Sequence, residues 1–178
     1  MVTSLNVYKC FLGYVWEKVF SHDTTVGYFP TLLDTLHYNV DDPDAPLYSI
    51  LDQIESYRKD GVFHIRLCYP EYTDLEFPCN EWTQSSNFVE EAVITDFHPI
   101  KLTWRMPGDN NQIGTFAGLG RNEIVWGSLI DDTPQADYWY HAIGSTSRYE
   151  RGVPGPMAIV LKTEVFVARP REGLSLGK

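Results

Sequence analysis

The sequence predicts a mainly β protein, an antiparallel β-sandwich of jelly-roll type with one α-helix near residues 46–59. Three observations support this. Seven or eight short segments with strand-like alternation follow one another at short spacing. Strands and helices do not alternate along the chain, which disfavours a parallel sheet. Aromatic residues make up 14% of the chain, a high share that is typical of sandwich cores and binding surfaces.

The first half of the chain contains the predicted helix. Alternation predicts a strand over 12–20, with Tyr14, Trp16, Lys18 and Phe20 on one side. A turn region over 22–30, a short helix or helical turn over 31–38 and an acidic loop over 39–44 follow. The helix is then predicted by apolar residues at helical spacing, with Asp44 as its cap. These apolar residues are Leu47, Ile50, Leu51, Ile54 and Tyr57.

Strand-like segments fill the rest of the chain. In the segment 63–69, Phe63, Ile65 and Leu67 alternate with His64 and Arg66. Further strands are expected at 92–97, 98–106, 124–130, 138–143 and 157–168, separated by glycine-rich loops at 107–120 and 144–156. The residues from 169 to 178 read as a polar tail. No repeat or linker interrupts the chain, so we expect one domain over 1–178.

Composition and charge exclude some classes of partner. The chain has 178 residues and a net charge of −10. Nucleic acid is not expected as a partner, because phosphate binding needs a basic face. No apolar run reaches the roughly 18–20 residues of a membrane span. Residues 1–6 lack the charged start and apolar run of a signal peptide, which leaves open a cytosolic protein or one whose signal has been removed.

The three cysteines predict one disulfide. Cys68 and Cys79 flank a short connection that contains Pro70 and Pro78, as the cysteines of a hairpin-closing disulfide do. Cys10 would then be buried, free or bonded to another chain. The spacing does not fit a zinc site.

Acidic loops and aromatic, amide-rich runs are the candidate sites. Asp41, Asp42 and Asp44 cluster oxygens that suit calcium, although capping and turn roles explain them equally well. Trp82 stands in a run of amides and hydroxyls, a combination that binds sugars but also occurs in strands that bury the tryptophan. The candidate ligand-binding residues are Trp82, Gln84, Asn87, Arg121, Trp139, Tyr140 and Arg148.

Several runs resemble a domain found in uncharacterised extracellular and matrix proteins of marine animals. They are Trp16-Glu17-Lys18-Val19-Phe20, the run 44–52, Cys68-Tyr69-Pro70-Glu71, Asn80-Glu81-Trp82-Thr83-Gln84-Ser85-Ser86-Asn87, the run 139–144 and Val153-Pro154-Gly155-Pro156. The ending over 138–167 is also similar to the closing strands of discoidin-like and other lectin-type sandwiches. The resemblance implies secretion and binding, and it carries no catalytic residues.

The function expected from these observations is non-enzymatic, extracellular recognition of a glycan or matrix ligand, without a cofactor other than calcium. Two alternatives stay open. One is a structural module that assembles into homo-oligomers through exposed aromatic residues. The other is a glycoside hydrolase that uses paired carboxylates, which would meet only in the folded chain.

Overall fold

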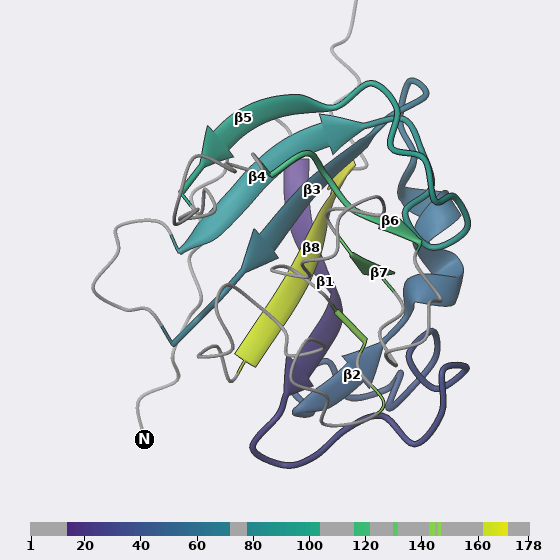
Figure 1. Cartoon of the computed structure of the whole chain (residues 1–178), viewed down its shortest axis with the longest axis vertical. Coiled ribbons are helices and arrows are strands. Elements are labelled where there is room, and N and C mark those ends of the chain that lie inside the picture. The colour runs from purple at the N-terminus through teal and green to yellow at the C-terminus, as the bar shows by residue number, and fades with distance from the viewer. Residues whose placement is uncertain are drawn as a thin grey trace, which may run out of the picture.

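The computed structural model of the chain describes residues 14–71, 78–103, 116–121, 130–131, 143–144, 146 and 162–170. They form a six-stranded antiparallel sheet in the order β2-β1-β8-β3-β4-β5 and a two-stranded sheet, β6-β7 (Figure 1). The mainly β prediction is therefore confirmed, whereas the sandwich remains a prediction. The strands are β1 (Tyr14–Asp23), β2 (Leu47–Ser49), β3 (Phe63–Cys68), β4 (Cys79–Gln84), β5 (His98–Leu102), β6 (Gly120–Arg121), β7 (Ile130–Asp131) and β8 (Lys162–Pro170).

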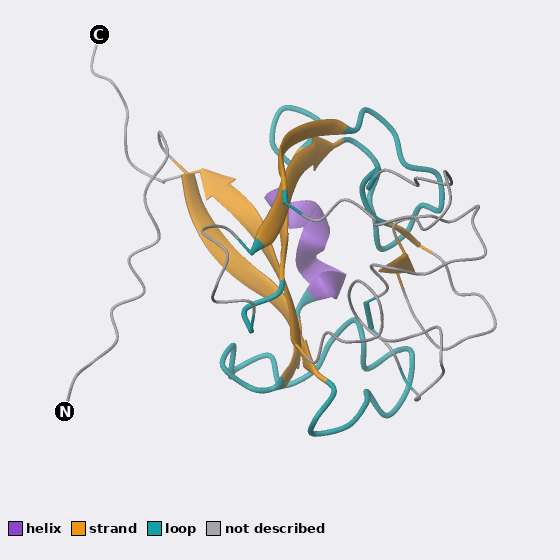
Figure 2. Cartoon of the chain, turned by 60° about the vertical axis from the view of Figure 1, so that its left-hand side comes forward, coloured by secondary structure: helices purple, strands orange, loops and turns teal. Residues whose placement is uncertain are grey.

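The large sheet has one buried face and one partly exposed face. Helix η1 (Leu51–Tyr57) and the small sheet lie on the same side of it (Figure 2). On β3, the side chains of Phe63, Ile65 and Leu67 are fully buried and belong to the core cluster that includes η1. His64 and Arg66 point to the opposite side and are half-buried. We call the two sides the core face and the outer face, and their alternation confirms the period of two predicted for this segment.

The predicted helix is wrong over its first part. Residues 47–49 form β2, because Ser49 exchanges two backbone hydrogen bonds with Tyr38 and β2 pairs with β1. The helix that follows is a 3₁₀ helix whose N-cap is Ile50, without a side-chain cap, so Asp44 does not cap it. Leu51, Ile54 and Tyr57 are its buried residues. A spacing of three places them on one side of a helix with three residues per turn.

Strand β1 departs from simple alternation. Its register against β8 shifts between Lys18 and Phe20, which marks a β-bulge. The bulge turns Phe20 into the core, whereas Trp16 packs against Phe166 and the disulfide on the outer face. The prediction that Trp16 and Phe20 share a side is therefore wrong, because the bulge inserts one extra residue between them.

The polar run that begins at Cys79 is strand β4, paired on both sides, which is the alternative in which a strand buries Trp82. Two other segments differ from the prediction. Residues 92–97 form bends and no strand. Arg169 and Pro170 are not part of a tail, because they pair with the first residues of β1. No helix in the described part of the chain is long and apolar enough to cross a membrane.

Candidate binding site

The predicted ligand residues Trp82 and Gln84 lie in the core. Both are fully buried on the core face of β4. The indole Nε1 of Trp82 donates to Gln84 Oε1 at 2.8 Å, and the ring packs edge-to-face on Phe116. Gln84 also exchanges hydrogen bonds with the backbone of Leu119, donating to its carbonyl at 2.9 Å and accepting from its N–H at 3.0 Å. The two side chains therefore hold residues 116–121 against the sheet. Because both are fully buried, they are not accessible to a ligand.

The other candidate residues are divided between the interior and segments that are not described. Asn87 is 2% exposed, and its side chain accepts from the N–H of Val89 and donates to Glu55. Arg121 is half-buried on β6, and its N–H donates to the Glu91 carbonyl at 2.8 Å. Trp139, Tyr140 and Arg148 lie outside the described residues.

The three candidate calcium ligands are exposed and do not converge. Asp42 Oδ1 accepts from the N–H of Asp44 within a turn, and Asp44 approaches Lys18 Nζ at 3.9 Å. The described His, Cys, Asp and Glu residues, Asp41 among them, form no group of three that could hold a metal ion. The local hydrogen bonds fit the turn role that these residues also allow.

The predicted disulfide is present. Cys68 and Cys79 are bonded and are register partners on β3 and β4. Both are buried and form a small apolar cluster with Phe166 and Trp16 on the outer face of the sheet. The bond therefore closes the hairpin next to the polar part of this face.

A charged and aromatic network occupies the centre of the outer face. Glu81 accepts from Arg66 Nε at 2.7 Å and lies 2.9 Å from His64 Nε2. The Arg66 guanidinium lies 3.9 Å from the centre of the Trp16 ring, a cation–π contact. His64 meets the same indole edge-on, at 4.8 Å between ring centres. The network fixes the position of the His64 ring.

The Glu81 carboxylate is held in its charged form. Burial by itself raises the pKa of Glu81, but the hydrogen bonds with His64 and Arg66, together with the positive charge of Arg66, outweigh it, so the pKa lies below its usual value. The negative charge of Glu81 neutralises the positive charge of Arg66. Neither residue of this pair is therefore available as a charged partner for a ligand.

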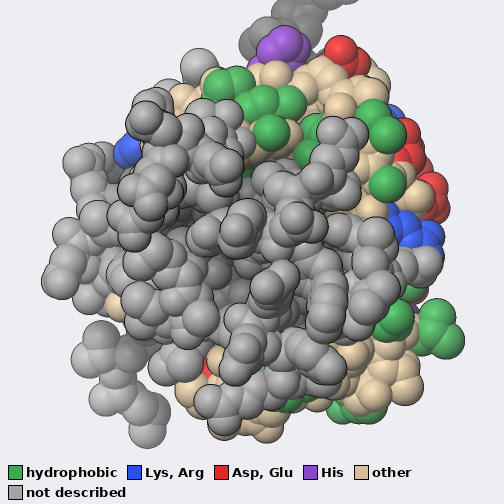
Figure 3. Space-filling model, viewed as in Figure 1, with side chains coloured by type: hydrophobic (Ala, Val, Ile, Leu, Met, Phe, Trp, Pro, Cys, Tyr) green, Lys and Arg blue, Asp and Glu red, His purple; other side chains and the backbone are tan. Residues whose placement is uncertain are grey.

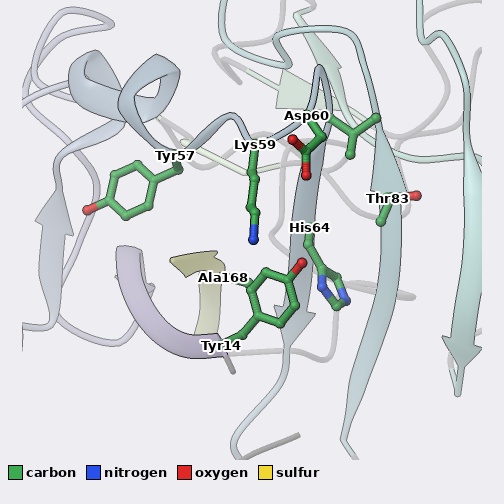
Figure 4. Close-up of a pocket in the computed structure, with 8 residues that line it drawn as sticks. Tyr14, Tyr57, Lys59, Asp60, His64, Thr83 and Ala168 are labelled. Carbon is green, nitrogen blue, oxygen red and sulfur yellow. The ribbon is translucent and has the colours of Figure 1, made fainter. Parts of the chain in front are cut away.

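A small pocket opens beside this network. Its cavity measures about 100 Å³ and is lined by Tyr14, Tyr57, Lys59, Asp60, Val62, His64, Thr83 and Ala168. Figure 4 shows the Lys59 side chain extending from the turn after η1 toward Tyr14, with the His64 ring beside the Tyr14 ring. The Lys59 ammonium lies 5.0 Å from the centre of the Tyr14 ring. Residues from η1, β1, β3, β4 and β8 thus meet at this point.

A tight turn presents the two charged residues of the pocket. Lys59 and Val62 exchange both backbone hydrogen bonds at 2.9 Å. The two residues between them have positive φ, 50° at Asp60 and 84° at Gly61. Aspartate followed by glycine is a preferred pair for hairpin turns of this kind. Neither the Lys59 ammonium nor the Asp60 carboxylate has an ion-pair partner among the described residues.

The hydroxyl of Tyr57 is directed away from the pocket. Its ring lines the cavity, whereas its oxygen points to the other side (Figure 4). Burial, reinforced by the hydrogen bond to Glu17 and by the negative charge of that residue, raises the pKa of Tyr57 to about 12. The phenol therefore stays neutral and contributes an apolar wall to the pocket.

Sequence reasoning missed this pocket because Tyr14, Thr83 and Ala168 are far along the chain from the segment 57–64, which supplies its other lining residues. Two signals could have indicated it. One is the Asp60-Gly61 pair between the helix and β3, which predicts a hairpin turn, and the other is the polar side of the alternating strand that carries His64. Their meeting with Tyr14 depends on the pairing of β1 with β8 and of β8 with β3.

The charges of the described surface do not form a field of one sign on the side seen in Figure 3. Acidic and basic side chains lie near one another along the margin at the right of this view.

Comparison with known proteins yields no match, whether by family model, curated protein or solved structure.

Proposed function

We propose that this chain is a non-enzymatic, extracellular recognition domain that binds carbohydrate through the pocket lined by Tyr14 and Lys59. The observation that carries the proposal is the set of groups in this pocket: the Tyr14 ring beside an ammonium and a carboxylate that form no ion pair among the described residues. An aromatic ring can pack on the C–H side of a sugar, while charged groups bind its hydroxyls. The disulfide supports an oxidising, extracellular location.

The size of the pocket favours a small part of a glycan. Its volume of about 100 Å³ is below the roughly 300–1,000 Å³ of pockets that enclose drug-sized ligands. A terminal sugar resting on the rim is the ligand that suits this volume. Asp60 is the one carboxylate among the residues that line the pocket. Since hydrolysis of glycosidic bonds commonly uses two carboxyl groups, binding without catalysis fits this site best.

A glycan array tests the proposal. We expect the folded chain to bind a set of glycans, and Tyr14→Ala to abolish that binding because it removes the aromatic wall. Asp60→Asn should weaken binding while the turn is kept, since asparagine also tolerates positive φ. Asp41→Asn is the matched control, because it removes the same charge from an exposed loop. No binding by the parent chain, or equal binding by all four proteins, would contradict the proposal.

A further inference from the structure

We infer that the sugar recognised by this pocket is an acidic one, whose carboxylate binds Lys59 and whose hydroxyls bind Asp60. This inference rests on the proposed function and adds the ligand class. It starts from the charges that face the cavity. His64 and Arg66 are both engaged by Glu81, so this network is compensated internally. Lys59 and Asp60 remain: the Lys59 ammonium contacts the Tyr14 ring, and neither charge forms an ion pair with the other or with another described residue.

The two charges lie at different parts of the pocket. Figure 4 shows the Lys59 ammonium extended toward Tyr14, whereas the Asp60 carboxylate stays near the turn. A ligand that complements both therefore needs an anionic group at one end and hydrogen-bond donors at the other. A neutral sugar supplies the donors but only hydroxyl oxygens for the ammonium. A sugar acid supplies both, and hydrogen bonds between charged groups are roughly twice as strong as neutral ones.

The negative net charge of the chain does not prevent an acidic sugar from binding next to Lys59. The net charge of −10 is spread over 178 residues. At physiological salt, exposed charges separated by more than about 8 Å are largely screened from one another. An ammonium in direct contact with a carboxylate therefore dominates over more distant acids. The net charge is expected to slow association and not to decide which sugar is held.

Paired probes test the inference. Glucose and glucuronate share a ring and differ by the carboxylate, so each is titrated into the folded chain and followed by NMR shifts of the Tyr14 and His64 signals. We expect glucuronate to bind at least roughly tenfold more tightly than glucose, since one charge-assisted hydrogen bond is worth about that factor. Lys59→Gln should remove this difference, because glutamine supplies no positive charge to the carboxylate.

The matched control removes the same positive charge at a position outside the pocket. Lys162→Gln removes one lysine from the opposite end of β8, and it should retain the preference for glucuronate. If glucose binds as tightly as glucuronate, or more tightly, the inference fails and the proposed sugar site stands. If neither sugar shifts the pocket signals at millimolar concentration, both fail. A preference that is lost equally in Lys162→Gln would also overturn the inference, because bulk charge would explain it.

Discussion

His22 and Thr163 are register partners on β1 and β8, and both are fully buried. His22 Nε2 lies 3.1 Å from the Gly27 carbonyl, but Nδ1 lacks a hydrogen-bond partner among the described residues. The hydroxyls of Thr163 and Ser21 lack one as well. A buried polar atom without a partner costs roughly 1–3 kcal/mol. These positions therefore lower the free energy of unfolding, and replacing them can raise it.

Thr163→Val is expected to stabilise the chain by about 1 kcal/mol, because valine keeps the shape and removes the unpaired hydroxyl. Urea unfolding measures the change. Thr35→Val is the matched control: Thr35 is also fully buried, but its hydroxyl donates to the Leu32 carbonyl. The control should destabilise the chain by about 1 kcal/mol. Equal losses in both variants would mean that the Thr163 hydroxyl has a partner in solution.

His22 should make stability fall in mild acid. Burial lowers its pKa below the ordinary 6.5, and the hydrogen bond to Gly27 only partly opposes this. The unfolded chain therefore takes up the proton more readily than the folded chain. Stability is fully present above about pH 6.5 and declines as the pH falls below that value toward the folded pKa, by at most about 1.4 kcal/mol per pH unit.

Melting between pH 8 and pH 5 tests this dependence. His22→Gln should flatten the decline near pH 6, whereas His98→Gln should not change it, because His98 is exposed on β5. An identical decline in the parent chain and in His22→Gln would assign the effect to other groups.

At the scale of elements, η1 is held by packing rather than by capping. Its N-terminus has no side-chain cap, and it runs for 7 residues, too short to be stable by itself in water. Leu51, Ile54 and Tyr57 are instead part of the same core cluster as the strands β1, β3 and β8. The helix therefore depends on the sheet.

Leu51→Ala should destabilise the chain by roughly 2–5 kcal/mol, because it leaves a cavity at a fully buried position. Denaturant unfolding gives the value. Gln53→Ala, on the exposed side of the same helix, should change stability by no more than about 0.5 kcal/mol. A Leu51 variant with an unchanged midpoint would show that η1 is not docked on the sheet.

The β3–β4 hairpin should be stabilised by its disulfide. The two cysteines are 11 positions apart, and closing a loop of this length restricts the unfolded chain by roughly 3 kcal/mol. The double variant Cys68→Ala/Cys79→Ala should lose about this amount in urea unfolding. Reducing agent should lower the midpoint of the parent chain and leave that of the double variant unchanged. A parent chain that is shown to be reduced by a thiol assay, yet unfolds at the same midpoint, would contradict this.

At the scale of the whole molecule, core and candidate site use opposite faces of one sheet. Trp82 and Gln84 join β4 to residues 116–121 on the core face. The Glu81 network lies on the outer face. The pocket lies beside it, and Tyr14, His64 and Thr83 line it from this face. Substitutions on the two faces should therefore have separable effects on stability and binding.

Trp82→Ala should destabilise the chain by roughly 3–5 kcal/mol, since it empties a fully buried site. Lys59→Gln should leave the free energy of unfolding within about 0.5 kcal/mol and alter sugar binding, because Lys59 is exposed on a turn. Calorimetry and sugar titration on the same samples separate the two effects. A Lys59 variant that loses much of its stability would place Lys59 in the fold rather than in a binding site.

The sequence by itself determined the features that depend on near neighbours. The alternation of Phe63, Ile65 and Leu67 identifies β3 and its buried side, because the strand period of two is set by the backbone. The disulfide pairing and the mainly β class were also predictable. The buried set of η1 was partly predictable, since Leu51, Ile54 and Tyr57 were recognised as one apolar stripe.

Only the tertiary structure decided which segments lie next to one another. Residues 47–49 have a helical pattern but become a strand, because Tyr38 and β1 supply hydrogen-bond partners that local propensity does not include. Trp82 has the neighbours of a sugar platform in sequence and those of a core residue in space, where Phe116 covers it. Tyr14 and Lys59 meet through the pairing of strands distant in sequence. Long-range strand pairing carries no local pattern, and for that reason the sequence does not reveal the pocket.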